Sequence, residues 1–255
     1  MQDLVVYGVV LSAVAMICWG FGDFFLQKCS RKMGDWETLF FLVLFGTVVT
    51  FFPVQAEIID IFKHPDERLL ILSITSIVLL AASLIEIESL KQGKLSVIEP
   101  VFILEIPVAG ILAAIFLSER ITPEQAVVAT ALVLGLVLVS LRSTNISARQ
   151  FLEKGVMIAI VGTILMGTIN FLFGLGSRET SALLVNWFTD AFLLICTTTY
   201  LLYNRKFRHT LKQIKKEGPL IFAVSVFDTA AWIAFAYALI FAPIFIVVAL
   251  SQLYI

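Results

Sequence analysis

Residues 8–31 read GVVLSAVAMICWGFGDFFLQKCSR, and residues 155–178 read GVMIAIVGTILMGTINFLFGLGSR. Both stretches end on the dipeptide Ser-Arg after a long apolar run, and the second lies 147 residues after the first. The order of the matching positions indicates an internal duplication. The matches are Gly8 with Gly155, Gly20 with Gly167, Asp23 with Asn170, Phe24 with Phe171, Ser30 with Ser177 and Arg31 with Arg178; a two-residue shift then aligns Ala81-Ala82 with Ala230-Ala231 and Leu90 with Leu239.

The composition excludes a soluble domain. Hydrophobic residues make up 60% of the chain, charged residues only 15%, and the mean hydropathy is +0.99. A helix needs roughly 20 apolar residues to cross a bilayer core of ~30 Å. The sequence therefore predicts an all-α membrane protein, a bundle of transmembrane helices. Nine apolar segments can be drawn, at about 4–26, 37–56, 68–88, 97–117, 124–141, 154–176, 180–203, 219–241 and 244–255.

A duplicated membrane unit with an odd number of spans inserts its two copies in opposite orientations. We therefore predict two inverted five-helix repeats, residues 1–144 and residues 145–255. The ninth segment follows Pro243 and is short, rising only about 18 Å as a helix. The repeat alignment predicts that the second copy is truncated within its fourth helix, so that about 9 of 10 helices are present. A nine-span protein with a short last helix is the alternative.

The basic residues predict the orientation. Of the 18 Lys and Arg residues, 14 lie after the odd-numbered segments up to the seventh, which predicts that this side is cytoplasmic and the N-terminus outside. The basic run 204–216 fits a cytoplasmic loop that contacts anionic lipid better than a nucleic-acid patch. The N-terminus lacks the basic region of a cleavable signal. We expect an integral multi-pass protein of a prokaryotic plasma membrane, with lipid but no nucleic acid as partner.

Metal and cofactor chemistry find no support in the sequence. The three cysteines, Cys18, Cys29 and Cys196, have no CxxC spacing and indicate neither a disulfide framework nor a metal site. The histidines His64 and His209 both lie in charged loops. We expect no cofactor and no bound metal.

Acidic residues inside the apolar segments are the strongest functional signal. Asp23, Glu105, Asp190 and Asp228 lie within the first, fourth, seventh and eighth segments, and Glu86 lies near the end of the third. A carboxylate at the bilayer centre costs about 2.5–3.5 kcal/mol on insertion scales. No Lys or Arg lies inside a segment to neutralise them. Each carboxyl should then be protonated, face an aqueous cavity or await a cation.

Polar and aromatic residues share helix faces with these acids. Trp19 precedes Asp23 by one turn, and Trp232 follows Asp228 by one turn. These faces predict one central cavity, and a carboxylate beside an indole suits an organic cation. Packing alone for the tryptophans, headgroup contact for Asp23 and surface pairing of Glu86, Glu88 and Glu99 with Lys91 and Lys94 remain the alternatives. The predicted binding residues are Trp19, Asp23, Glu105, Asn170, Asn186, Asp190, Asp228 and Trp232.

The fourth segment contains the sequence Glu105-Ile106-Pro107. Proline removes a backbone hydrogen bond to the carbonyl four residues earlier and kinks a helix. Kinked spans near the membrane centre are where carriers place binding sites and hinges. Pro107 is therefore a predicted helix kink, with a role in helix packing as the alternative.

Two stretches resemble EamA-type carriers of the drug/metabolite transporter superfamily. Residues 18–28, which begin Cys-Trp-Gly-Phe-Gly-Asp-Phe, look like the first-helix motif, and residues 105–122 are similar to the fourth helix and its exit. The resemblance implies ten helices in two inverted repeats, alternating access, and a path lined by Trp19, Asp23 and Glu105. The family's Asn-like position is Asp23 here. Relatives often keep both termini in the cytoplasm, whereas the basic residues place this N-terminus outside.

Three functional hypotheses follow. The first is a secondary-active transporter of small organic solutes or metabolites by alternating access, with protons as a possible coupling ion. The second is a flippase or exporter of a lipid-linked or amphipathic substrate on the same scaffold. A remote third, an intramembrane aspartyl protease built on Asp190 and Asp228, lacks the YD and GxGD motifs. We therefore expect a carrier rather than an enzyme, as a monomer or homodimer.

Overall fold

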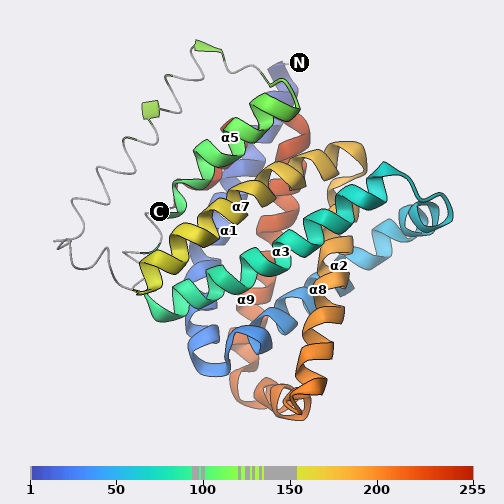
Figure 1. Ribbon diagram of the computed structural model, residues 1–255, viewed down its shortest axis with the longest axis vertical. Coiled ribbons are helices and arrows are strands. Elements are labelled where there is room, and N and C mark those ends of the chain that lie inside the picture. The colour runs from blue at the N-terminus through green and yellow to red at the C-terminus, as the bar shows by residue number, and fades with distance from the viewer. Residues whose placement is uncertain are drawn as a thin grey trace.

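The computed structural model describes residues 2–93, 98, 101–119 and 154–254, and single positions 122, 123, 127, 130, 131 and 134. Within these residues the chain is all-helical, and six helices are long and apolar enough to cross a membrane (Figure 1), which confirms the predicted helical membrane bundle. The fifth predicted segment, apart from single positions, and the repeat boundary lie outside the described residues. The helices are α1 (Gln2–Met33), α2 (Asp35–Lys63), α3 (Glu67–Gln92), α5 (Glu105–Phe116), α7 (Lys154–Glu179), α8 (Ala182–Tyr203), α9 (Phe207–Phe241) and α10 (Ile244–Ser251).

The helix α9 corrects one prediction. The basic run 204–216, predicted as a loop, is helical from Phe207 onward. The helix bends at Glu217, whose φ of −118° and ψ of 15° are not helical. Pro219 explains the bend, because proline cannot donate to the carbonyl four residues earlier and disfavours the helical conformation just before it.

The helix exteriors are apolar, and buried hydroxyls bond within their own helices. On α1 the side chains of Val6, Tyr7 and Val10 are more than half exposed, as expected of a surface in contact with lipid. Buried Ser12 and Thr163 donate to carbonyl oxygens one turn earlier, at 2.8 Å each. This bonding satisfies polar groups without water, which the hydrocarbon core requires.

The contacts at the end of α9 fix the directions of the first helix of each half. A Cβ at Gly8, near the start of α1, would lie 2.7 Å from the Cβ of Ala242. Arg178, in the last turn of α7, donates through Nη2 to the Ala242 carbonyl at 3.0 Å. The end of α9 therefore lies beside the start of α1 and the end of α7. It follows that α1 and α7 run in opposite directions, as an inverted repeat requires.

The helix pairings repeat when the two halves are exchanged. The two most extensive interfaces join α1 to α9 and α3 to α7, and each becomes the other on exchange (Figure 1). The interface of α2 with α8 exchanges with itself, and the contact of α5 with α7 corresponds to that of α10 with α1. The core is therefore built between the halves rather than inside each one.

The repeated Ser-Arg dipeptide also has a repeated contact. Arg31 donates to the carbonyls of Lys91 (3.2 Å) and Gly93 (2.7 Å) at the end of α3. In the other half, Arg178 donates to the carbonyls of Leu239 (2.8 Å) and Ala242 (3.0 Å) at the end of α9. The last carbonyls of a helix have no partner within it, and a cation there also complements the helix dipole. Arg31 thus stabilises the end of α3, and Arg178 stabilises the end of α9.

The helical conformation is interrupted one turn before Pro107. Residues 103 and 104 form a turn, with Leu104 N–H bonded to Val101 C=O and Ile106 N–H bonded to Ile103 C=O, both at 3.1 Å. Proline at position 107 has no N–H to give to Ile103 C=O, so a regular helix cannot continue through this point. The second half has a corresponding turn, because α10 ends at Ser251 and residues 252–254 form a turn.

Candidate functional site

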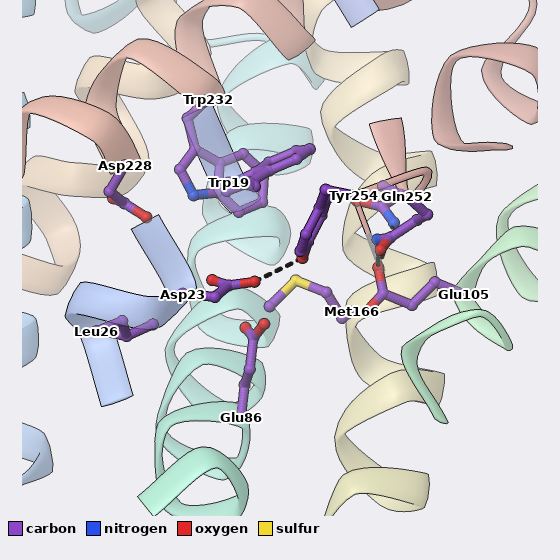
Figure 2. Close-up of a pocket in the computed structure, with 11 residues that line it drawn as sticks. Trp19, Asp23, Leu26, Glu86, Glu105, Met166, Asp228, Trp232, Gln252 and Tyr254 are labelled. Carbon is purple, nitrogen blue, oxygen red and sulfur yellow. Dashed lines mark hydrogen bonds between the residues drawn. The ribbon is translucent and has the colours of Figure 1, made fainter. Parts of the chain in front are cut away.

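A central cavity of about 50 Å³ lies between the two halves (Figure 2). It receives side chains from α1, α3, α5, α7 and α9 and from the turn after α10. Both predicted repeats therefore contribute to one site. Its lining residues are Trp19, Asp23, Leu26, Glu86, Glu105, Met166, Asn170, Asp228, Trp232, Gln252 and Tyr254.

A second cavity of about 50 Å³ adjoins the first. The two share Leu26, Glu86, Asp228 and Trp232, so they are neighbouring compartments with a common wall. Asn186 and Asp190 line only the second. All eight predicted binding residues thus line one or both cavities.

An inter-repeat hydrogen bond joins α7 to α5 in the central cavity. Asn170 donates through Nδ2 to Glu105 Oε2 at 2.9 Å. Gln252 donates to the same oxygen at 3.0 Å, and both acceptor and donors are almost fully buried. Two amide donors on one carboxyl oxygen hold Glu105 in a fixed position.

A second inter-repeat hydrogen bond joins α1 to the turn after α10. The Tyr254 hydroxyl donates to Asp23 Oδ2 at 2.6 Å, and Asp23 is 5% exposed (Figure 2). In the repeat alignment Asp23 corresponds to Asn170, and Tyr254 corresponds to Glu105. The two bonds are therefore equivalent in position, but the donor and acceptor have exchanged places.

The two predicted tryptophans pack against each other and also line the cavity. The ring centroids of Trp19 and Trp232 are 5.4 Å apart with an interplanar angle of 86°, an edge-to-face arrangement (Figure 2). Phe173 packs on Trp232 with centroids 4.7 Å apart. Trp19 and Trp232 therefore both pack against each other and line the cavity, so the two alternatives do not exclude each other.

The side chain of Asp190 contacts a glycine on the facing helix. A Cβ added to Gly46 of α2 would lie 2.0 Å from Asp190 Oδ2, so a larger residue there would force this carboxyl to move. The neighbouring Asn186 donates to Ala182 C=O within α8 at 2.7 Å. The interface of α2 with α8 thus brings Asp190 to the second cavity.

Five residues that line the central cavity are not among the predicted binding residues: Leu26, Glu86, Met166, Gln252 and Tyr254. Glu86 lines both cavities, and Lys91 pairs with Glu88 and, at 2.7 Å, with Asp35. Figure 2 shows the carboxyl groups of Glu86 and Asp23 directed toward the same space. The repeat alignment offered one signal, because it matches Tyr254 with Glu105. Glu99 and Lys94 lie outside the described residues.

Basic side chains are absent from the described linings of both cavities. Among the described residues, no group of three or more His, Cys, Asp and Glu residues is arranged to hold a metal ion. The site is therefore acidic and aromatic. It suits binding of protons or of a cation more than binding of an anion.

These features define a class: an integral multi-pass membrane protein with acidic cavities enclosed by its helices. The profile of the EamA-like transporter family matches residues 6–141, slightly more than half of the chain. The chain belongs to the EamA-like transporter family. Among curated proteins, none matches the chain.

Proposed function

We propose that this protein is a secondary-active carrier that moves a small organic solute by alternating access and couples the movement to protons. The observation that carries this proposal is the convergence of acids from five helices. Asp23, Glu105, Asp190, Asp228 and Glu86 come from α1, α5, α8, α9 and α3 and meet in two adjoining cavities.

The small size of the cavities makes full ionisation of these acids unfavourable. Several carboxylates in a compartment of about 50 Å³ with no described basic lining residue would repel one another and lack solvation. Protons or a cationic solute must balance them. A site that exchanges one for the other, opening alternately to each side, couples solute movement to a proton gradient.

The ion pairs at one end of the bundle support the orientation that we propose. Lys32 at the end of α1 pairs with Glu217, Lys91 at the end of α3 with Asp35, and Lys206 before α9 with Glu37. These helix ends therefore lie on the same membrane face. We place this basic face in the cytoplasm of a prokaryotic cell and the N-terminus outside.

Reconstitution tests the carrier proposal. The chain in liposomes with an imposed pH gradient is given a panel of labelled amines, amino acids and sugars. We expect gradient-driven uptake of at least one solute, and loss of that uptake in Asp190→Asn and Asp228→Asn. The control is Asp60→Asn, because Asp60 is exposed, lines neither cavity and, within the described part of the chain, pairs with Arg68. Full uptake in both cavity variants would refute the proton-coupling mechanism.

The other two hypotheses are less well supported than the carrier. A flippase for lipid-linked substrates needs contacts to anionic headgroups, and the described cavity linings carry no Lys or Arg. Asp190 and Asp228 do line one cavity together, as a protease would need. The EamA-like family comprises transporters, however, so the carrier is the function we propose.

A further inference from the structure

The side chain of Gln252 leaves one buried acceptor atom without a partner. Gln252 is 6% exposed and lines the central cavity. Its Nε2 donates to Glu105 at 3.0 Å, which directs the other amide atom, Oε1, away from that carboxyl. Oε1 is buried and has no hydrogen-bond partner among the residues that the structure describes. A buried acceptor normally has a donor, so this oxygen indicates a ligand that carries N–H or O–H groups.

The negative charge of the same cavity indicates that the ligand is a cation. Four acids line it, Asp23, Glu86, Glu105 and Asp228, and no described lining residue is basic. A ligand with positively charged N–H groups would form charge-assisted hydrogen bonds with these carboxyls, which are stronger than neutral ones. An anionic or phosphorylated ligand would meet the negative charge of these acids and no described basic side chain.

The aromatic wall of the cavity fits the apolar part of such a ligand. Trp19 and Trp232 both line the cavity, with their ring centroids 5.4 Å apart. Indole rings attract a nearby cation through their faces and also bury alkyl groups. The tryptophans, the carboxyls and Gln252 Oε1 therefore place three different kinds of contact around one small space.

We propose that the central cavity binds a compact protonated amine, held through its N–H groups by Asp23 and Gln252 Oε1 and through its carbon atoms by Trp19 and Trp232. This inference rests on the carrier function and names its substrate class. The Tyr254 hydroxyl donates to Asp23 at 2.6 Å, at the acceptor that the amine would use. Amine binding therefore replaces the Tyr254 bond to Asp23 with an N–H bond.

The need for N–H donors separates this ligand from other cations. A quaternary ammonium ion has charge but no donor, so it leaves Gln252 Oε1 unpaired and gives Asp23 no hydrogen bond. The cavity volume of about 50 Å³ also favours a small alkylammonium ion over a bulky one. Selectivity for a primary over a quaternary amine is therefore the sharpest consequence of the geometry.

Binding to the purified chain in lipid nanodiscs tests this selectivity. The probes are propylammonium, propyltrimethylammonium, propanol and propionate, followed by tryptophan fluorescence and by the shift in Tm. We expect propylammonium to bind at least about tenfold more tightly than the quaternary probe, the effect of one lost charge-assisted hydrogen bond. Equal binding of the two cations, or preferential binding of propanol or propionate, would overturn the proposal.

The residue assignment is tested with Gln252→Met, which keeps the length of the side chain and removes Oε1. We expect this variant to lose part of the preference for propylammonium, since Asp23 still accepts an N–H bond, while its binding of the quaternary probe stays within about twofold. Ser251→Ala is the matched control, since the neighbouring Ser251 hydroxyl donates to Val248 C=O at 3.0 Å and lines neither cavity. If Gln252→Met does not fold, Asp23→Asn must weaken propylammonium binding; unchanged binding would refute the site.

The outcomes separate this inference from the carrier function. If no propylammonium binds but a pH gradient still drives another solute in a manner that requires Asp190 and Asp228, the amine assignment is wrong and the carrier stands. If propylammonium binds with the expected selectivity but no gradient moves it into liposomes, the site stands and the carrier function is wrong.

Discussion

The two halves of this molecule use the same repeated glycines for the same close contacts. Gly8 and Gly155 each face the residue after the third helix of the other half, Ala242 and Gly93 respectively. Gly20 lies against Tyr254, in the turn after α10, and Gly167 lies against Val108 of α5. Because a larger side chain would separate the helices, the duplicated sequence keeps these positions small.

The halves differ where the repeated positions reach the central cavity. One inter-repeat bond runs from Asn170 to Glu105, and its equivalent runs from Tyr254 to Asp23. Both bonds connect a first helix to the interrupted fourth helix of the opposite half. In the first bond α7 supplies the donor, Asn170, whereas in the second α1 supplies the acceptor, Asp23. The packing positions are thus alike in the two halves, whereas the positions that line the cavity differ in chemistry.

Replacing a cavity residue of one half by its counterpart in the other half should have the largest effect, a loss of uptake. Asp23→Asn makes the first half resemble the second and keeps an acceptor for Tyr254, so folding should persist. Proton-driven uptake should fall about a hundredfold, a loss of roughly 2.7 kcal/mol, because a cavity carboxyl is gone. Uptake into liposomes at a fixed pH gradient measures this change.

Adding Asn170→Asp to Asp23→Asn sharpens the comparison. The total number of carboxyls is restored, but the new one lies against Glu105 instead of Tyr254, because Asn170 is 2.9 Å from Glu105. Two adjacent carboxyls favour a shared proton. We therefore expect no recovery of uptake. Recovery in the double variant would show that the halves are interchangeable at the cavity.

Removing either of the two repeated arginines should have the next largest effect, a loss of folding stability. Arg178→Ala removes two bonds to carbonyls and an ion pair with Glu119 at 2.6 Å, whereas Arg31→Ala removes the two carbonyl bonds. We expect a loss of about 2–3 kcal/mol for Arg178→Ala and about 1 kcal/mol for Arg31→Ala. Thermal unfolding in detergent measures both values. Glu119→Gln, which keeps an acceptor for Arg178, should lie between them.

Replacing the repeated glycines with alanine should lower the stability by a smaller amount, which should differ between Gly20 and Gly167. A Cβ at Gly167 would lie 2.7 Å from the Cβ of Val108, whereas one at Gly20 would lie 3.2 Å from the Cβ of Tyr254. Overpacking of this kind costs about 1–2 kcal/mol, so Gly167→Ala should lower the Tm more than Gly20→Ala. Gly218→Ala is the control, since nothing lies within 4 Å of its added Cβ. The reverse order would contradict the packing described here.

The sequence predicted the helical bundle and the cavity residues because both follow from local rules. Charge-free runs give the spans, and isolated acids such as Asp190 are costly in lipid without a polar site. Which contacts each acid makes depends on the crossing of distant helices, which no local pattern encodes. Gly46, for example, becomes meaningful only when α8 brings Asp190 to it. Likewise Gln252 has no distinctive local context, and only its bond to Glu105 places it at the site.

The two inter-repeat bonds themselves should give the smallest effects, since hydrogen bonds between membrane helices contribute only about 0.6 kcal/mol on average. Tyr254→Phe removes the single bond to Asp23 and should cost roughly that amount. Glu105→Gln keeps an oxygen that accepts from Asn170 and Gln252, so it should change the Tm less. Thermal unfolding of both variants in the same detergent compares the halves directly. A larger loss for Glu105→Gln would mean that its negative charge, rather than its hydrogen bonds, stabilises the cavity, which would reverse the assignment of equivalent roles to the two bonds.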